Sequence, residues 1–120
     1  MVLDSSALLI LLRGESGHER VAKSLEANAC MTSVSLTVVL AALTNANARG
    51  VLEDIGRLGV EVVALDTITA LEAARFHTAS KSFELVFALA LAKMRGLELL
   101  TGIPRTELSP NPSVKIHSLR

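Results

Sequence analysis

Short β-branched apolar runs alternate along the chain with longer runs of helical periodicity. Such alternation predicts βαβ units, in which helices cover a parallel sheet. The clearest strand pattern is that of residues 60–65, which are rich in valine and lead to an aspartate. We expect five strands, the last at an edge of the sheet, over residues 2–3, 29–32, 60–65, 97–101 and 113–119. The predicted fold class is α/β, in a single domain that spans residues 1–120.

Glycines and prolines indicate where the helical runs stop. Gly50 is expected to end a helix that begins at Ser33 or Ser35, and Gly96 to end the apolar helix before the fourth strand. Three prolines make residues 104–112 a loop, and polar residues make 80–82 a turn. The expected helices are residues 7–12, 15–27, 33–48, 51–58, 66–79 and 84–94.

Four polar residues stand where predicted strands end. They are Asp4, Ser33, Asp66 and Thr101. Ligands of open α/β sheets bind beyond the carboxyl ends of the strands, so chemistry is expected there. We interpret Asp66 as the cap of the following helix, and we expect Asp4, Ser33 and Thr101 to lie close together.

Composition narrows the choice of partners. Twelve basic residues balance twelve acidic ones, and three phenylalanines occur with no tryptophan or tyrosine. Neither a basic excess nor an aromatic platform for bases is present, so the composition does not favour a general nucleic-acid binder. Apolar residues make up 50% of the chain, more than a core of this size readily hides. The excess predicts a covered surface, through a homodimer or a partner protein.

The chain is expected to be cytoplasmic and not bound to a membrane. Asp4 stands where the basic start of a signal peptide would be, and Arg13 ends the apolar stretch that follows. The longest apolar run, residues 85–92, has the length of a buried helix and is too short for a membrane span.

Several segments, taken in order, resemble one known family. Residues 2–9 read VLDSSALL, followed by GESG at 14–17, TSVSL at 32–36, GVEVVALD at 59–66 and GLELLT at 96–101. This succession resembles the PIN-domain proteins, including the toxin ribonucleases of the VapC type. The resemblance implies a three-layer α/β/α fold with a five-stranded parallel sheet in the order 3-2-1-4-5.

The resemblance also implies a metal site, which this sequence alters. In the family about four acidic residues hold Mg²⁺ or Mn²⁺, and the bound cation activates a water for RNA hydrolysis. The first acidic position falls on Asp4, but two others fall on Val38 and Ile103, and the remaining one on Leu85. Glu84 is one residue from that position and reaches the site only if the helix is rotated or reset.

The candidate site residues are therefore few. Asp4 and Glu84 are the candidate catalytic residues, Asp4 is the candidate metal ligand, and Ser6 and Thr101 are candidates for lining the pocket. An alternative compensating residue is Glu107, which reaches the site if it swings back from the proline loop, although Pro104 and Arg105 intervene. The cofactor is Mg²⁺ or Mn²⁺ if the protein is active, and otherwise none.

Three functions are compatible with these residues. The first is a degenerate VapC-type toxin homologue that binds protein or RNA, with lost or weak nuclease activity. The second is a Mg²⁺- or Mn²⁺-dependent endoribonuclease toxin of a toxin–antitoxin pair. The third is a receiver-type signalling domain, which the chain supports poorly because no pair of adjacent acidic residues follows the first strand.

The sequence also predicts which partners the protein has. We expect a homodimer, built from leftover apolar residues within 36–43 and 51–58, with an antitoxin-like protein as the alternative occupant. Arg13, Arg20 and Lys23 are interpreted as a solvated face, with contact to RNA or to a partner as the alternative. Cys30 is interpreted as a buried hydrophobe.

Overall fold

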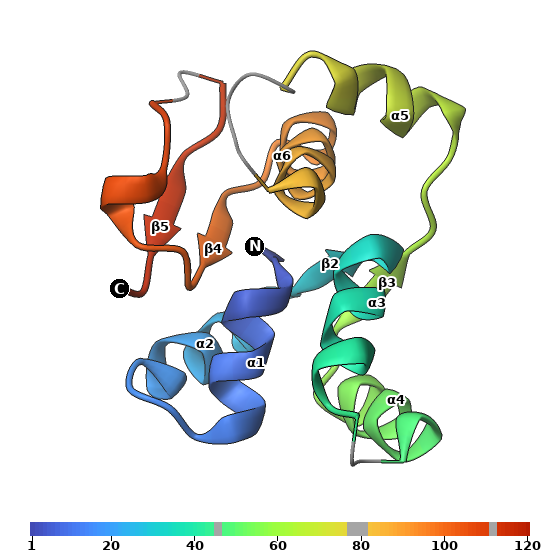
Figure 1. Cartoon of the computed structure of the whole chain (residues 1–120), viewed down its shortest axis with the longest axis vertical. Coiled ribbons are helices and arrows are strands. Elements are labelled where there is room, and N and C mark those ends of the chain that lie inside the picture. The colour runs from blue at the N-terminus through green and yellow to red at the C-terminus, as the bar shows by residue number, and fades with distance from the viewer. Residues whose placement is uncertain (45–46, 77–81, 111–112) are drawn as a thin grey trace.

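The computed structural model describes residues 1–44, 47–76, 82–110 and 113–120, which form a five-stranded parallel sheet in the order β3-β2-β1-β4-β5 (Figure 1). All four pairings between neighbouring strands are parallel. This confirms the predicted fold class and strand order, with β5 at an edge. The strands are β1 (Val2–Leu3), β2 (Cys30–Thr32), β3 (Glu61–Val63), β4 (Leu99–Thr101) and β5 (Ile116–Ser118).

The helices cover both faces of the sheet. They are α1 (Ser5–Arg13), α2 (His18–Ser24), α3 (Ser33–Ala42), α4 (Ala48–Arg57), α5 (Thr67–Ala74) and α6 (Phe83–Arg95). Short 3-10 helices occur at Leu25–Ala27 and Arg105–Glu107. None of the helices among the described residues is long and apolar enough to cross a membrane.

Alternation along the strands divides the core into two clusters. Val2 packs with α5 and α6, whereas its neighbour Leu3 packs with the helices on the other face. Leu99 and Leu100 of β4 divide in the same way. Because successive strand side chains point to opposite faces, the central strands are buried on both sides. Burial on both sides explains why the sequences of these strands are continuously apolar.

Side-chain caps and glycines set most helix ends. Asp4, Thr32 and Asp66 precede α1, α3 and α5, and the side chain of each accepts a hydrogen bond from a backbone N–H of the first turn. Gly96 adopts a left-handed conformation after α6, with φ of 65°, as predicted for a residue that ends a helix.

Several predicted boundaries are corrected. Gly50 does not end the third helix: α3 stops at Ala42, and Gly50 lies inside α4 because Asn47 caps that helix by accepting a hydrogen bond from Arg49 N–H. The helix predicted for 15–27 is a shorter α2 followed by a 3-10 turn, and α5 ends at Ala74. The end predicted at residue 79 and most of the turn at 80–82 fall outside the described residues. The predicted loop 104–112 contains a 3-10 helix, and its residues 111–112 also fall outside them.

Candidate functional site

Asp4 and Thr101 meet at the carboxyl edge of the sheet. Asp4 follows β1 and caps α1, and Thr101 ends the neighbouring strand β4. The Thr101 hydroxyl donates a 2.5 Å hydrogen bond to Asp4 Oδ2. Ala7 N–H donates to Asp4 Oδ1 over 3.0 Å. The parallel pairing of the two strands therefore places a buried carboxylate and a buried hydroxyl in direct contact.

Ser6 joins the same network through a close approach of α1 to the loop after β4. Its hydroxyl donates to Asp4 Oδ1 over 2.6 Å and accepts from Gly102 N–H over 2.7 Å. A Cβ at position 102 would lie 3.2 Å from Ser6 Oγ and 2.8 Å from Ile10 Cδ1. Glycine at this position is what allows the serine to reach both partners.

Burial changes the acidity of Asp4. The side chain is 2% exposed, and its removal from water raises the pKa of Asp4 from 3.8 to about 6. The hydrogen bonds from Ser6, Thr101 and Ala7 lower this pKa, and the negative charge of Glu84 raises it slightly. Desolvation is the largest of these effects, so the site favours a protonated Asp4 more than water does.

Glu84 brings a second carboxylate into contact with the same edge. Its side chain lies in the first turn of α6 and accepts hydrogen bonds from Ser5 N–H (2.7 Å) and Ser5 Oγ (2.5 Å). Ser5 is the first residue of α1, where backbone N–H groups favour a negative charge. The next residue, Leu85, is 2% exposed and packs in the core. The helix is therefore set so that Glu84, and not the residue after it, faces the site.

A third element reaches Glu84 from α3. Ser35 Oγ donates to Glu84 Oε2 over 2.6 Å, and Thr32 caps the helix by accepting from Ser35 N–H. Ser35 is thus the residue of this segment at the site, in the place expected for Ser33. The expectation that Val38 faces the site is also corrected: it is 37% exposed and does not line the pocket, although it follows Ser35 by one helical turn.

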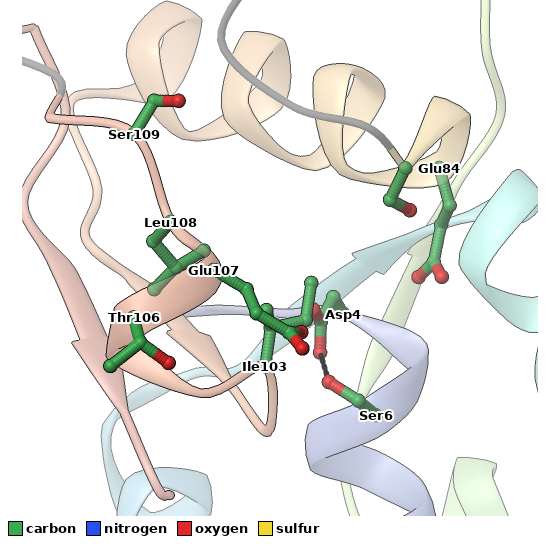
Figure 2. Close-up of a pocket in the computed structure, with 9 residues that line it drawn as sticks. Asp4, Ser6, Glu84, Ile103, Thr106, Glu107, Leu108 and Ser109 are labelled. Atoms are coloured by element: carbon green, nitrogen blue, oxygen red, sulfur yellow. Dashed lines mark hydrogen bonds between the residues drawn. The ribbon is translucent and has the colours of Figure 1, made fainter.

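Asp4 and Glu84 open onto a pocket of about 640 Å³ (Figure 2). Ile103 lines this pocket, as expected from its position after β4. Glu107 lines it as well, as in the alternative in which it swings back from the proline loop, and Figure 2 shows its side chain extending toward Asp4. The 3-10 helix that follows Pro104 turns the chain back over the site. The other lining residues are Ser6, Ser82, Thr106, Leu108 and Ser109.

The donor set does not fit a resident Mg²⁺ or Mn²⁺ ion. Asp4 Oδ1 and Glu84 Oε2 each already accept two hydrogen bonds from the protein, which occupies both lone pairs of each oxygen. Asp4 Oδ2 and Glu84 Oε1 each accept one more. Within residues 1–44, 47–76, 82–110 and 113–120, no three His, Cys, Asp or Glu side chains gather closely enough to hold a metal ion.

Ser5 and Ser35 belong to this hydrogen-bond network but are not among the site residues that the sequence predicts. In the sequence, Ser5 is part of the motif at residues 2–9, and Ser35 is a position where a helix is expected to begin. The spacing Thr32-x-x-Ser35 is a capping pattern that places Ser35 in the first turn of α3, and this signal was available. For Glu107 the sequence leaves the position open, because a proline predicts a turn but not the direction of the segment that follows.

A comparison with protein families finds one match. The model of the PIN domain matches residues 1–102 of this chain. No curated protein matches it.

Solved structures with similar folds include two toxin–antitoxin complexes and one toxin. A toxin–antitoxin complex from Klebsiella pneumoniae aligns with a TM-score of 0.79 at 12% identity, covering 99% of this chain and 97% of the other. DNA-bound VapBC from Salmonella typhimurium aligns at 0.68 and 18%, with the same coverage. A VapC toxin of Mycobacterium tuberculosis that cleaves the sarcin–ricin loop aligns at 0.61 and 14%, covering 92% and 89%. At these identities the likeness shows a shared fold.

Proposed function

This chain belongs to the PIN domain family, and from that membership we propose that it is a VapC-type toxin homologue whose acidic pocket binds a cationic side chain of a partner protein. In this proposal the protein hydrolyses RNA weakly or not at all. The walls of the pocket are formed and held in place by Asp4, Glu84, Ser6 and Thr101. Glu107 adds a third negative charge to the pocket.

The charge of the pocket carries the proposal. Three of its lining residues are carboxylic acids, Asp4, Glu84 and Glu107, and among the nine described residues that line it none is basic. A cleft lined by charges of one sign concentrates ligands of the opposite sign. A phosphodiester is repelled from such a surface unless a cation intervenes, and a guanidinium or ammonium group is attracted to it.

The way the two inner carboxylates are held supports the same conclusion. Asp4 and Glu84 are fixed by hydrogen bonds from Ser6, Thr101, Ser5 and Ser35, so they do not need a metal ion to hold their positions. One lone pair remains on Asp4 Oδ2 and one on Glu84 Oε1, so each inner carboxylate can accept one further hydrogen bond from a guanidinium N–H, whereas a divalent cation needs several free oxygen ligands. Glu107 is exposed at the rim, where it adds charge to the entrance.

An antitoxin-like protein is the partner that we propose. Two of the solved structures with this fold are described as a toxin–antitoxin complex and as DNA-bound VapBC. A basic segment of such a partner supplies the arginine or lysine that this pocket requires. The proposed activity is therefore recognition of protein by a pocket in the place where other family members carry their acidic residues.

A Mg²⁺- or Mn²⁺-dependent endoribonuclease is the second candidate function. It is favoured by one observation, that Asp4, Glu84 and Glu107 line a single pocket at the carboxyl edge of the sheet. Mg²⁺ is held in some sites by one or two carboxylates, with waters and substrate phosphates completing its shell. We rank this second because most lone pairs of the two inner carboxylates are already used.

An NMR titration tests the proposal. The probe is a short peptide with one central arginine, compared with the same peptide carrying neutral citrulline. We expect the arginine peptide to shift the amide resonances of Ser6, Gly102 and Ile103, and the citrulline peptide to leave them unchanged. Glu107→Gln should weaken binding several-fold, whereas Glu53→Gln, on the exposed side of α4, should not. Equal shifts from both peptides, or none at these amides, would contradict the proposal.

A further inference from the structure

A second pocket, of about 340 Å³, lies between α2 and the neighbouring strands β4 and β5. Arg20, Lys23 and His117 supply its nitrogen groups, and no carboxylate is among the residues of the described part of the chain that line it. The remaining walls are Met1, Ser24 and Leu100. It therefore has the opposite electrostatic character to the acidic pocket.

Secondary structure brings these basic groups together. Arg20 and Lys23 are three residues apart on α2, so they share one face of that helix. On β5, Ile116 packs against the cluster under α6, and the alternation of the strand turns His117 to the face on which α2 lies. A hydrogen bond from Arg20 Nη1 to the carbonyl oxygen of Ser118 ties α2 to this edge, and Figure 1 shows the two elements on the same side of the molecule.

The two cations of α2 remain available for a ligand. Within the described part of the chain, neither Arg20 nor Lys23 forms an ion pair with a carboxylate, and both are exposed. The bond from Arg20 to Ser118 uses one of five guanidinium N–H groups. Glu98 is the acidic neighbour: it accepts from His117 Nε2 over 2.7 Å and pairs with Lys115, and it does not line the pocket.

We propose that this pocket binds a phosphate group, with Arg20 and Lys23 as its ligands. A guanidinium presents parallel N–H donors that match two phosphate oxygens, and an ammonium adds a point charge beside them. The phosphate is either a diester of a single-stranded RNA backbone or the monoester of a free nucleotide, since both offer the same oxygens.

This site is separate from the acidic pocket and does not depend on its proposed function. Met1 precedes β1 and lines the basic pocket, whereas Asp4 follows β1 and lines the acidic one. The two pockets thus lie toward opposite ends of that strand. Loss of phosphate binding leaves the arginine-peptide titration unaffected, so the two proposals fail independently.

Fluorescence anisotropy with a labelled single-stranded oligoribonucleotide tests whether the pocket binds a phosphate of an RNA backbone. The Arg20→Gln, Lys23→Gln double variant is compared with an Arg49→Gln, Arg57→Gln control, which removes the same charge from exposed positions outside the pocket. We expect the first variant to raise the dissociation constant about tenfold or more and the control less than about twofold. The slope of log K against log salt should fall by about 0.7, because the variant removes one phosphate contact and each such contact on a single strand contributes about 0.7.

NMR titration with AMP, inorganic phosphate and unphosphorylated adenosine tests whether the pocket binds the phosphate of a free nucleotide. Shifts at the amides of residues 20–24 and 117 from AMP and phosphate, but not from adenosine, support a free phosphorylated ligand. Binding of the oligonucleotide alone, with the predicted sensitivity, assigns the pocket to the RNA backbone. If neither ligand binds, or if the double variant matches the control with whichever ligand does, the proposal is wrong.

Discussion

The Glu84 carboxylate lies 2.6 Å from the Ser35 hydroxyl, and this contact joins two helices whose contacting residues are 49 positions apart in sequence. The same carboxylate accepts two hydrogen bonds from Ser5 at the start of α1. One acidic side chain therefore links α6, α3 and α1 at the carboxyl edge of the sheet. Its interactions are those of a structural contact between helices.

Substituting Glu84 should destabilise the protein. Glutamine in Glu84→Gln keeps one acceptor oxygen, but its NH₂ group then faces hydroxyl or N–H donors of Ser5 and Ser35. We expect the free energy of unfolding in urea to fall by about 2–3 kcal/mol, since hydrogen bonds to charged groups are worth about 1.5–3 kcal/mol. The exposed Glu53→Gln serves as the control, with a change below about 0.5 kcal/mol. If Glu84→Gln lowers the free energy of unfolding no more than the control does, then Glu84 does not have the structural role described here.

The stability should depend on pH through Asp4. Its pKa is raised on folding from 3.8 to about 6, so the folded state holds the proton more tightly and stability falls as pH rises between these values. A shift of about two units corresponds to about 3 kcal/mol. The unfolding free energy of the wild type minus that of Asp4→Asn should therefore decrease by about this amount from below pH 3.8 to above pH 6. A difference that stays flat or grows with pH would show that burial does not control this carboxyl.

Gly102 should not tolerate alanine. The added Cβ would meet Ser6 Cβ and Oγ at 3.2 Å and Ile10 Cδ1 at 2.8 Å, and overpacking of this kind costs about 1–3 kcal/mol. Gly56→Ala is the matched control, because nothing lies within 4 Å of its Cβ and the residue is inside α4. That variant should be neutral or stabilised by up to about 1 kcal/mol. Thermal unfolding measures both, and equal effects would show that α1 is not held close to β4 here.

The sequence predicts the sheet well and the site only in part. Strand order and fold class follow from the resemblance and from alternation, and Asp4 and Thr101 meet because both end neighbouring parallel strands. The direction of Glu84 does not follow from spacing alone. It depends on the burial of Leu85 against the sheet, which fixes the rotation of α6.

The positions of loop residues relative to the site do not follow from the sequence either. Helix and strand periodicity fixes which side chains share a face, but it says nothing about where a turn directs the next segment. Glu107 reaches the pocket because a 3-10 helix follows Pro104. Val38 was misplaced because its position was carried over from the family, whereas in this chain Ser35, one turn earlier on α3, makes the contact.

We expect the protein to form a homodimer, through a different face from the one the sequence suggested. The most exposed large apolar side chains among the described residues are Ile68, Leu71 and Phe83, at 65%, 68% and 79%, on α5 and at the start of α6. Burial of these side chains favours pairing of two copies.

Light scattering at micromolar concentration should give about twice the 12.7 kDa of one chain. Leu71→Glu should yield monomer, whereas Leu52→Glu, within the segment 51–58 that the sequence favoured, should leave the dimer intact. A monomeric wild type, or a dimer broken only by Leu52→Glu, would contradict this assignment.

Calorimetric titration of the protein with Mn²⁺ at neutral pH tests most directly whether the acidic pocket has lost its metal site. Because both lone pairs of Asp4 Oδ1 and of Glu84 Oε2 are used by internal donors, we predict no binding stronger than about millimolar, and the same trace for Asp4→Asn. This follows from the cost of desolvating a dication without enough free oxygen ligands. Micromolar affinity for Mn²⁺ that Asp4→Asn abolishes would contradict the account and would favour the second candidate function, a metal-dependent endoribonuclease.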